Sequence, residues 1–316
     1  MRIHYEKGVP ILVWLIVGMV PRASAQLFTR GDLQHQIELY ESALSKAQET
    51  NSQYAQIGRI ELRLAALYQD IGLYDKSEDT FERAIRTFRK PGSPLDLAAA
   101  IDGLGTVYLQ IGNIAEAERA ELKALKIREE VGQKPDLACS WSHLAALYLR
   151  ERRAAQAREY AERAVTEFSS DANASADEKI NAQLTLSLAL GLSHKYPEAI
   201  ERLQSTIRLE RETYGPNDFP VGFGTFLLGY VHWKAGELAP AGELMRQGTD
   251  IMGQQLGWWS PTYRSVMTQY AHFLRATHQK DRAQKIEQNV DRALAASNTI
   301  PNSRHNRETT DATAFF

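Results

Sequence analysis

The sequence predicts an all-α solenoid, in which antiparallel helix pairs stack one after another, and three observations indicate it. Apolar and small residues of the stretch 99–124 recur along most of the chain at intervals of 40 to 42 residues, a spacing typical of stacked repeats. Within each interval, those residues follow the three-four spacing of one helix face. Prolines mark the beginnings of several units, at Pro94, Pro135, Pro220 and Pro261.

The unit that begins at residue 95 shows the helix–turn–helix pattern most clearly. Its first helix carries an apolar face formed by Ile101, Leu104, Gly105 and Tyr108. Gly112 follows, and glycine tolerates the positive φ that often ends a helix. The second helix carries small residues at Ala117, Ala120 and Ala124. Small residues such as Gly105 and Ala117 allow the two helices to approach closely.

This pattern resembles the tetratricopeptide repeat. The third unit carries the resemblance through Trp141, Leu144, Ala145, Tyr148, Ala157, Tyr160 and Ala164, and the first through Leu64, Ala65, Tyr68, Gly72, Tyr74, Phe81 and Ala84. The period exceeds the family's usual length of about 34 residues. The longer period is similar to that of the repeats of kinesin light chains. The segment 211–220, RETYGPNDFP, resembles the loop between repeats in those proteins. The resemblance covers about residues 32–290 and implies a right-handed superhelical solenoid.

From the N-terminus onward, the chain divides into four predicted parts. They are a signal peptide at 1–25, a lead with a capping helix at 26–53, the solenoid at 54–297 and a disordered tail at 298–316. The six repeats span about 54–94, 95–134, 135–176, 177–219, 220–260 and 261–297. The fifth repeat is rich in glycine, which costs about 1 kcal/mol per residue in a helix. We therefore expect it to be the softest repeat unless close packing or a partner compensates.

The N-terminal 25 residues have the three parts of a secretory signal peptide. Arg2 and Lys7 form a basic start, an apolar run of ten residues covers 11–20, and small residues at 23–25 suit cleavage after about Ala25. The run is too short for an ordinary membrane-spanning helix. An uncleaved anchor is the alternative. The expected location is therefore extracytoplasmic, either periplasmic or secreted.

Composition and motifs argue against several functions. The formal net charge is −2, which offers no electrostatic footprint for nucleic acid. The single cysteine, Cys139, excludes an internal disulfide; a buried small residue is the first interpretation and a reactive or intermolecular thiol the second. The chain has no metalloprotease, nucleophile-elbow or phosphate-loop motif. We expect no enzymatic activity, no cofactor and no metal site. His232 and His272 lie about one unit apart but lack a third ligand.

Glutamates at 116, 118 and 121 suggest a solvated face of the second helix in that unit. A partner site is expected instead on the concave face, which the first helices line in the tetratricopeptide family. Carried onto this sequence, the candidate partner-binding residues are Arg59, Asp102, Thr106, Ser142, Asn181, Phe223, Phe226, Tyr230, Trp233, His272 and Arg275.

The fifth repeat contributes an aromatic stripe, Phe223, Phe226, Tyr230 and Trp233, to this candidate site. Exposed aromatic residues are favoured anchors at binding surfaces, so the stripe is a candidate floor for a peptide or partner helix. An apolar stripe at helical spacing is also typical of core. Both interpretations stay open at this point.

Together, these features favour a non-catalytic scaffold that binds a peptide or protein in its concave groove, with no nucleic acid partner and no membrane contact after signal cleavage. The alternative is a structural or regulatory subunit of an envelope complex, which associates through a solenoid end or the convex face, including by self-association. An unrecognised hydrolase is a third hypothesis and requires convergent polar groups in the groove.

The helix contact at Gly105 generates a stability prediction. Gly105→Leu should lower the free energy of unfolding by about 1–3 kcal/mol, because the added side chain overpacks the contact between the two helices. Thermal unfolding followed by circular dichroism measures the change. A melting curve that superimposes on that of the parent chain would refute the close contact.

Overall fold

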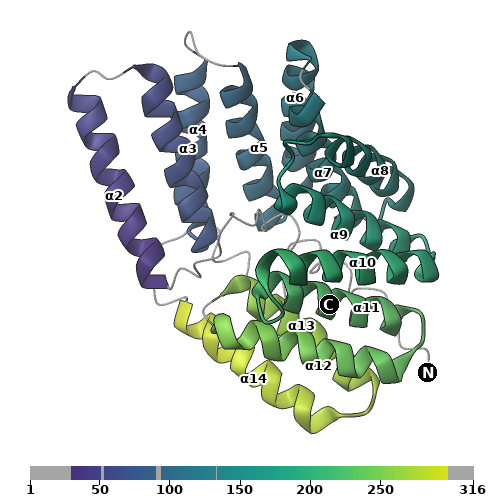
Figure 1. The fold of residues 1–316 in the computed structure, drawn as a ribbon. Coiled ribbons are helices and arrows are strands. Elements are labelled where there is room, and N and C mark those ends of the chain that lie inside the picture. The colour runs from purple at the N-terminus through teal and green to yellow at the C-terminus, as the bar shows by residue number, and fades with distance from the viewer. Residues whose placement is uncertain (1–29, 51–52, 90–93, 133, 259, 298–316) are drawn as a thin grey trace. The chain divides into compact units, whose positions relative to one another are not determined.

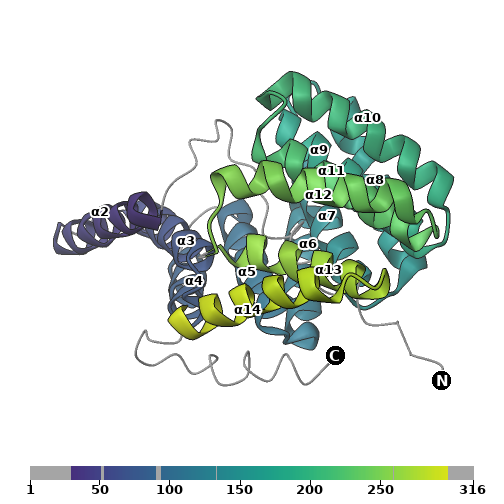
Figure 2. The same cartoon turned by 90° about the horizontal axis from the view of Figure 1, so that it is seen from below.

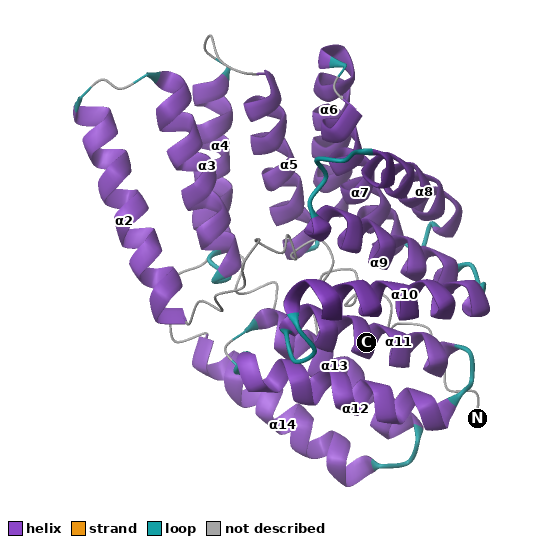
Figure 3. Cartoon of the chain, in the orientation of Figure 1, coloured by secondary structure: helices purple, strands orange, loops and turns teal. Residues whose placement is uncertain are grey.

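The computed structural model describes residues 30–50, 53–89, 94–132, 134–258 and 260–297. Within these ranges all regular structure is helical and strands are absent (Figure 3), which confirms the predicted all-α class. The proposed signal peptide at 1–25 and the proposed tail at 298–316 lie outside the described residues. Among the described helices, none combines the length and apolar character needed to cross a bilayer.

The helices follow one another in antiparallel pairs after a single first helix (Figure 1). They are α2 (Arg30–Glu49), α3 (Tyr54–Asp70), α4 (Tyr74–Phe88), α5 (Pro94–Ile111), α6 (Ile114–Val131), α7 (Lys134–Arg150), α8 (Ala154–Ser170), α9 (Ala176–Leu192), α10 (Tyr196–Tyr214), α11 (Phe219–Lys234), α12 (Leu238–Gln255), α13 (Pro261–Ala276) and α14 (Lys280–Ser297). The described chain forms two compact units that divide after Leu147, inside α7. We call residues 30–147 the N-terminal unit and residues 148–297 the C-terminal unit.

In the N-terminal unit, each helix packs on the next, from α2 to α6. Figures 1 and 2 both show α2, α3, α4 and α5 side by side. The first helix, α2, buries Leu33, Ile37 and Leu44 against Leu64 and its neighbours on α3. This is the contact that a capping helix makes with the first repeat.

Every helix pair turns through the same backbone motif. One or two residues beyond the end of each first helix stands a residue with positive φ: Gly72, Gly112, Arg152, His194, Gly236 and His278. The next residue then donates its N–H to a carbonyl five residues back, as Leu73 does to Tyr68 at 2.8 Å. This is the Schellman arrangement, which satisfies carbonyls that a helix end would otherwise leave unpaired. Three of the six positions are not glycine, although glycine adopts this conformation most readily.

The small residues predicted at the start of each second helix are fully buried. Ser77, Ala117, Ala157, Ala199, Ala241 and Ala283 are all 0% exposed. Gly105 meets the second helix of its own pair, because a Cβ there would lie 2.8 Å from Glu121 Oε1 and 3.1 Å from Ala120 Cβ. The close approach predicted at Gly105 is therefore confirmed.

In the C-terminal unit, α11 and α12 approach until their backbones touch. A Cβ on Gly248 would lie 2.5 Å from the Gly222 carbonyl oxygen and 2.6 Å from the Phe226 nitrogen. A Cβ on Gly229 would lie 2.7 Å from the Met245 nitrogen. Close packing thus accounts for glycines that weaken the intrinsic helix propensity of this pair.

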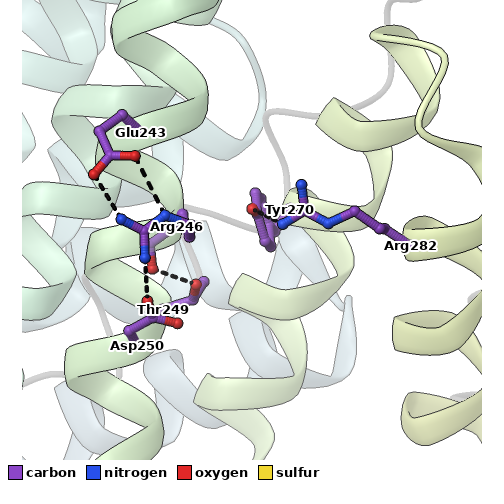
Figure 4. Close-up of polar contacts among 6 residues, drawn as sticks. All are labelled: Glu243, Arg246, Thr249, Asp250, Tyr270 and Arg282. Carbon is purple, nitrogen blue, oxygen red and sulfur yellow. Dashed lines mark hydrogen bonds and ion pairs between the residues drawn. The ribbon is translucent and has the colours of Figure 1, made fainter.

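The last helices of the C-terminal unit carry exposed ion pairs and a polar link between helices (Figure 4). Arg246 on α12 lies between two carboxylates of its own helix, 2.6 Å from Glu243 Oε1 and 2.8 Å from Asp250 Oδ2. Arg282 on α14 donates to the Tyr270 hydroxyl on α13 at 3.1 Å. The Arg282 bond joins two helices, whereas the exposed pairs on α12 contribute little to stability.

Two glycine-to-alanine changes in the C-terminal unit should have opposite effects on stability, because only one of the glycines lies in the contact between α11 and α12. Gly248→Ala should lower the free energy of unfolding by about 1–3 kcal/mol, because the new methyl group strikes backbone atoms of α11. Gly191→Ala should instead raise it by about 0.5–1 kcal/mol, since on α9 the nearest atom to a new Cβ is Val231 Cγ2 at 3.7 Å. Urea unfolding measures the free energy of unfolding of both variants. If both changes raise it, helix propensity and not packing determines the effect at Gly248.

Candidate functional site

Four charged side chains gather between α5, α6 and α7 in the N-terminal unit. Asp102 Oδ2 accepts a hydrogen bond from Arg128 Nη2 at 2.7 Å and lies 3.1 Å from His143 Nδ1. The same His143 nitrogen lies 3.6 Å from Glu121 Oε2. The side chains of Asp102, Glu121 and Arg128 are 6%, 3% and 7% exposed, whereas that of His143 is 25% exposed. We call Asp102, Glu121, Arg128 and His143 the buried ion cluster.

The cluster overturns two predictions. Asp102 and Thr106 were expected to face a partner, but both are buried because α6 and α7 cover this part of α5. Glu121 was expected on a solvated face and is also buried. The sequence contained a signal for this burial, because Glu121 and Arg128 fall on the same face of α6 as the small residues Ala117 and Ala124. Charged residues on the buried face of a helix indicate a buried polar cluster.

Burial and charge act against each other in this cluster. Desolvation favours the neutral form of Asp102, but the charges of His143 and Arg128 outweigh it and lower the Asp102 pKa. Desolvation and the charge of Asp102 together raise the pKa of Glu121. Desolvation favours neutral His143, but the two carboxylates outweigh it and raise the His143 pKa.

The aromatic stripe of α11 is mostly core. Phe223 and Phe226 are 0% exposed and Tyr230 is 4% exposed, so the expectation that these three side chains form an exposed floor is wrong. The physical reason is that α11 packs against α9, α10 and α12 at once. A helix covered on several sides needs apolar residues around most of its circumference. Trp233, the last member of the stripe, stays half-exposed.

Trp233 lies in a cationic neighbourhood near the end of α11. Its indole meets the rings of Tyr230 and Phe273 edge to face, at 5.9 Å and 5.6 Å between centroids. The Lys234 ammonium lies 4.5 Å from the centroid of the Trp233 ring. The structure thus brings α11 and α13 together here, and leaves one aromatic side chain accessible beside a charged group.

Three positive groups and one carboxylate influence this neighbourhood. Desolvation and then the charge of Arg152 lower the pKa of Lys234. Desolvation, Arg275 and Lys234 lower the pKa of His272, which Glu287 opposes. We call the residues Arg152, Trp233, Lys234, His272 and Arg275 the Trp233 patch. The positive groups Arg152, Lys234 and Arg275 outnumber the neighbouring carboxylate of Glu287, so the patch suits an anionic group.

The remaining predicted partner residues are dispersed. In the N-terminal unit, Arg59 is exposed and forms an ion pair with Asp96 at 3.1 Å, and Ser142 is half-buried on α7. In the C-terminal unit, Asn181 is half-buried on α9, and Arg275 forms an ion pair with Glu287 on α14. Cys139 on α7 is half-buried. Of the predicted residues, the structure brings together only Trp233, His272 and Arg275 as an accessible group.

Glu210 on α10 is a buried acid that sequence reasoning missed. It is 0% exposed, and among the described residues neither of its carboxylate oxygens has a hydrogen-bond partner. Its side chain lies against Gly224 on α11, where a Cβ would lie 3.1 Å from Glu210 Cδ. Desolvation raises the Glu210 pKa well above its ordinary value, and the charge of Arg211 opposes this only in part. Such a group is stable in a protein interior mainly as the neutral acid.

Comparison with known proteins locates a repeat family in part of the chain. The family model described as Tetratricopeptide repeat matches residues 56–130 and 96–166. The residues from 56 to 166 therefore consist of tetratricopeptide repeats. No curated protein matches the chain in sequence.

Solved structures share the fold at low sequence identity. BtubC (BKLC) from P. vanneervenii is 20% identical over 76% of this chain and 95% of its own, with a TM-score of 0.52. The apo form of RapI is 13% identical over 92% of this chain and 99% of its own, with a TM-score of 0.68. NprR in complex with its cognate peptide NprX is 15% identical over 84% of this chain and 74% of its own, with a TM-score of 0.62. At these identities the likeness concerns the fold alone.

The buried acid predicts a pH-dependent effect of Glu210→Gln. The raised folded pKa of Glu210 means that its contribution to stability is greatest below the unfolded pKa and declines as the pH rises. The variant has no carboxyl group at this position. Its free energy of unfolding should therefore equal that of the parent near pH 4.5 and exceed it by about 1 kcal/mol or more at pH 8. Urea unfolding across this pH range measures the difference.

Glu212→Gln is the matched control, because Glu212 lies on the same helix and is exposed. Its difference from the parent should not grow with pH. A Glu210→Gln variant that tracks the parent at every pH would show that Glu210 is ionised and solvated in the folded chain.

Proposed function

We propose that this chain is a non-catalytic interaction protein that binds an acidic peptide segment at the Trp233 patch. The observation that carries the proposal is the half-exposed indole of Trp233, held against Phe273 and next to the Lys234 ammonium. A tryptophan in such a place supplies a rigid apolar contact, and residues of this type dominate binding energy at interfaces.

The electrostatics of the patch favour a carboxylate as the ligand group. Lys234 is partly desolvated and has a cationic neighbour, Arg152, and both effects lower its pKa. A bound carboxylate would stabilise the protonated form of Lys234 and reverse this shift. An aspartate, a glutamate or a peptide C-terminus next to an apolar side chain therefore fits the patch.

Solved structures of this fold support a peptide as the ligand. The structure of NprR holds its cognate peptide NprX, and a Rap protein structure holds the competence and sporulation factor. PilW, described as a widely conserved type IV pilus biogenesis factor, is also similar in fold. Sequence identities of 12% to 16% with these proteins mean that a ligand cannot be transferred by similarity.

We further propose that the chain acts outside the cytoplasm after cleavage near Ala25. The support is the basic, apolar and small-residue order of residues 1–25. N-terminal sequencing of the protein recovered from its natural compartment tests this, with Gln26 as the expected first residue. Recovery of an intact Met1 terminus would favour the uncleaved anchor.

A second candidate function is association through the first helices of the solenoid. Leu39 on α2 and Tyr54 on α3 are 56% and 52% exposed, and exposed apolar side chains can contribute to a docking surface. A structural or regulatory subunit that docks through these residues, or pairs with a second copy, is therefore the alternative to the peptide scaffold.

Selection from a random peptide library on the immobilised mature chain tests the proposal. We expect peptides that combine acidic residues with one aromatic or branched apolar residue. Trp233→Ala should weaken the binding of a selected peptide by about 30-fold, a loss of about 2 kcal/mol typical of an interface hot spot. Lys234→Gln should weaken it by about 10-fold and reduce its salt dependence.

Arg246→Gln is the control, because Arg246 is an exposed cation on α12 with its carboxylate partners on the same helix (Figure 4). It should leave peptide binding unchanged. Selected peptides that bind Trp233→Ala and Lys234→Gln as tightly as the parent would exclude the patch. If Leu39→Ser abolishes association with a partner or a second copy while the patch variants retain it, the second candidate function is correct.

A further inference from the structure

The buried ion cluster brings together three side chains of the types that hold transition metal ions. Asp102 on α5, Glu121 on α6 and His143 on α7 each offer one ligand atom, and these atoms all lie within 4.8 Å of one another. Contraction around one ion requires only small side-chain movements, because ligand atoms about 2 Å from a zinc ion lie little more than 3 Å apart. The His143 nitrogen is already 3.1 Å from Asp102 Oδ2 and 3.6 Å from Glu121 Oε2.

Two buried oxygen atoms of the cluster lack hydrogen-bond partners among the described residues. They are Asp102 Oδ1 and Glu121 Oε2, on side chains that are 6% and 3% exposed. Buried acceptors without partners are unfavourable and rare. A cation between them would satisfy both, whereas within the cluster Arg128 hydrogen-bonds only the other oxygen of Asp102.

Arg128 has the position of a residue that orients a metal ligand. It donates to Asp102 Oδ2 at 2.7 Å and to the hydroxyl of Ser140 on α7. This contact holds one oxygen of the Asp102 carboxylate, whereas Oδ1 has no hydrogen-bond partner among the described residues. Hydrogen bonds of this kind commonly hold ligating carboxylates in place.

We propose that Asp102, Glu121 and His143 form a binding site for a divalent transition metal ion, with Zn²⁺ as the best match. Two carboxylates and one imidazole suit Zn²⁺, whereas Mg²⁺ and Ca²⁺ prefer sets of oxygen ligands. The half-exposed edge of His143 provides the path by which the ion and a water ligand enter. The site links the second repeat pair, α5 and α6, to α7 of the next repeat, so the ion stabilises the packing of successive repeats.

Zinc titration of the full chain, after treatment with a chelator, tests the proposal by calorimetry. We expect one Zn²⁺ per chain and a rise in Tm of at least about 3 °C at saturating metal. Co²⁺ should give the visible absorption of a protein-bound ion and be displaced by Zn²⁺. In the parent protein, one equivalent of Zn²⁺ should shift the imidazole resonances of His143 and leave those of the other histidines in place.

Glu121→Gln and His143→Asn should each weaken zinc binding by at least about 10-fold, and circular dichroism should show that both variants are helical. Glu129→Gln on the same helix and His35→Asn on α2 are matched controls, because both side chains are exposed; they should bind as the parent does. The proposal fails if the folded parent binds no stoichiometric zinc, or if zinc shifts other histidines instead of His143. Either result would mean that Asp102, Glu121, Arg128 and His143 balance one another's charges without an ion.

Discussion

The close approach of the two helices in each pair is the constraint on which the rest of this structure depends. At the start of every second helix stands a serine or alanine with no exposed surface, and α11 and α12 go further, with glycines where one backbone meets the other. Because the helices are so near, the larger side chains are forced outward to the flanks of each pair. Phe81 of α4 fills space against Gly103 on α5 of the next pair, and Phe88 of α4 fills space against Gly58 on α3 of its own pair.

Tight helix contacts also explain where the buried acids lie. Glu121 on α6 lies against Gly105 of its own pair, and Glu210 on α10 lies against Gly224 on α11 of the next pair. In both places a carboxylate occupies space that a missing Cβ leaves open. A third acid, Glu61 on α3, accepts a hydrogen bond from Thr87 on α4 at 2.9 Å. Buried polar groups rarely add net stability, but they penalise alternative registers in which they would lose their partners. In a chain of similar repeats, such a penalty opposes pairing of the wrong helices.

Much of the fold was predictable from the sequence because its signals are periodic. The turn positions and the small residues recur at 40 or 42 residues, and the prolines Pro94 and Pro135, like Pro220 and Pro261, lie 41 residues apart. Each repetition strengthens the same inference. The α3 helix was expected at about 54–71 and lies at Tyr54–Asp70. The candidate site was harder, because the sequence cannot show which faces of a helix are covered. Phe223 and Phe226 sit at positions that line a groove in relatives, yet α11 is enclosed and they are core. Asp102 and Glu121 were assigned to exposed faces by residue type, although their register matched the core.

The non-glycine turns carry a consequence for how the chain folds. Arg152, His194 and His278 adopt φ values of 58°, 60° and 63°, at a cost of about 1 kcal/mol or more each. The pairs α7–α8, α9–α10 and α13–α14 are therefore less stable by themselves, and contacts with neighbouring pairs offset the cost of their turns. In a one-dimensional array, structure starts where the intrinsic energy of a repeat is lowest and spreads through interfaces. Glycine turns give α3–α4, α5–α6 and α11–α12 that advantage. By this argument folding starts more readily in α3–α6 and in α11–α12, and the three pairs with non-glycine turns form their turns with the support of the pairs next to them.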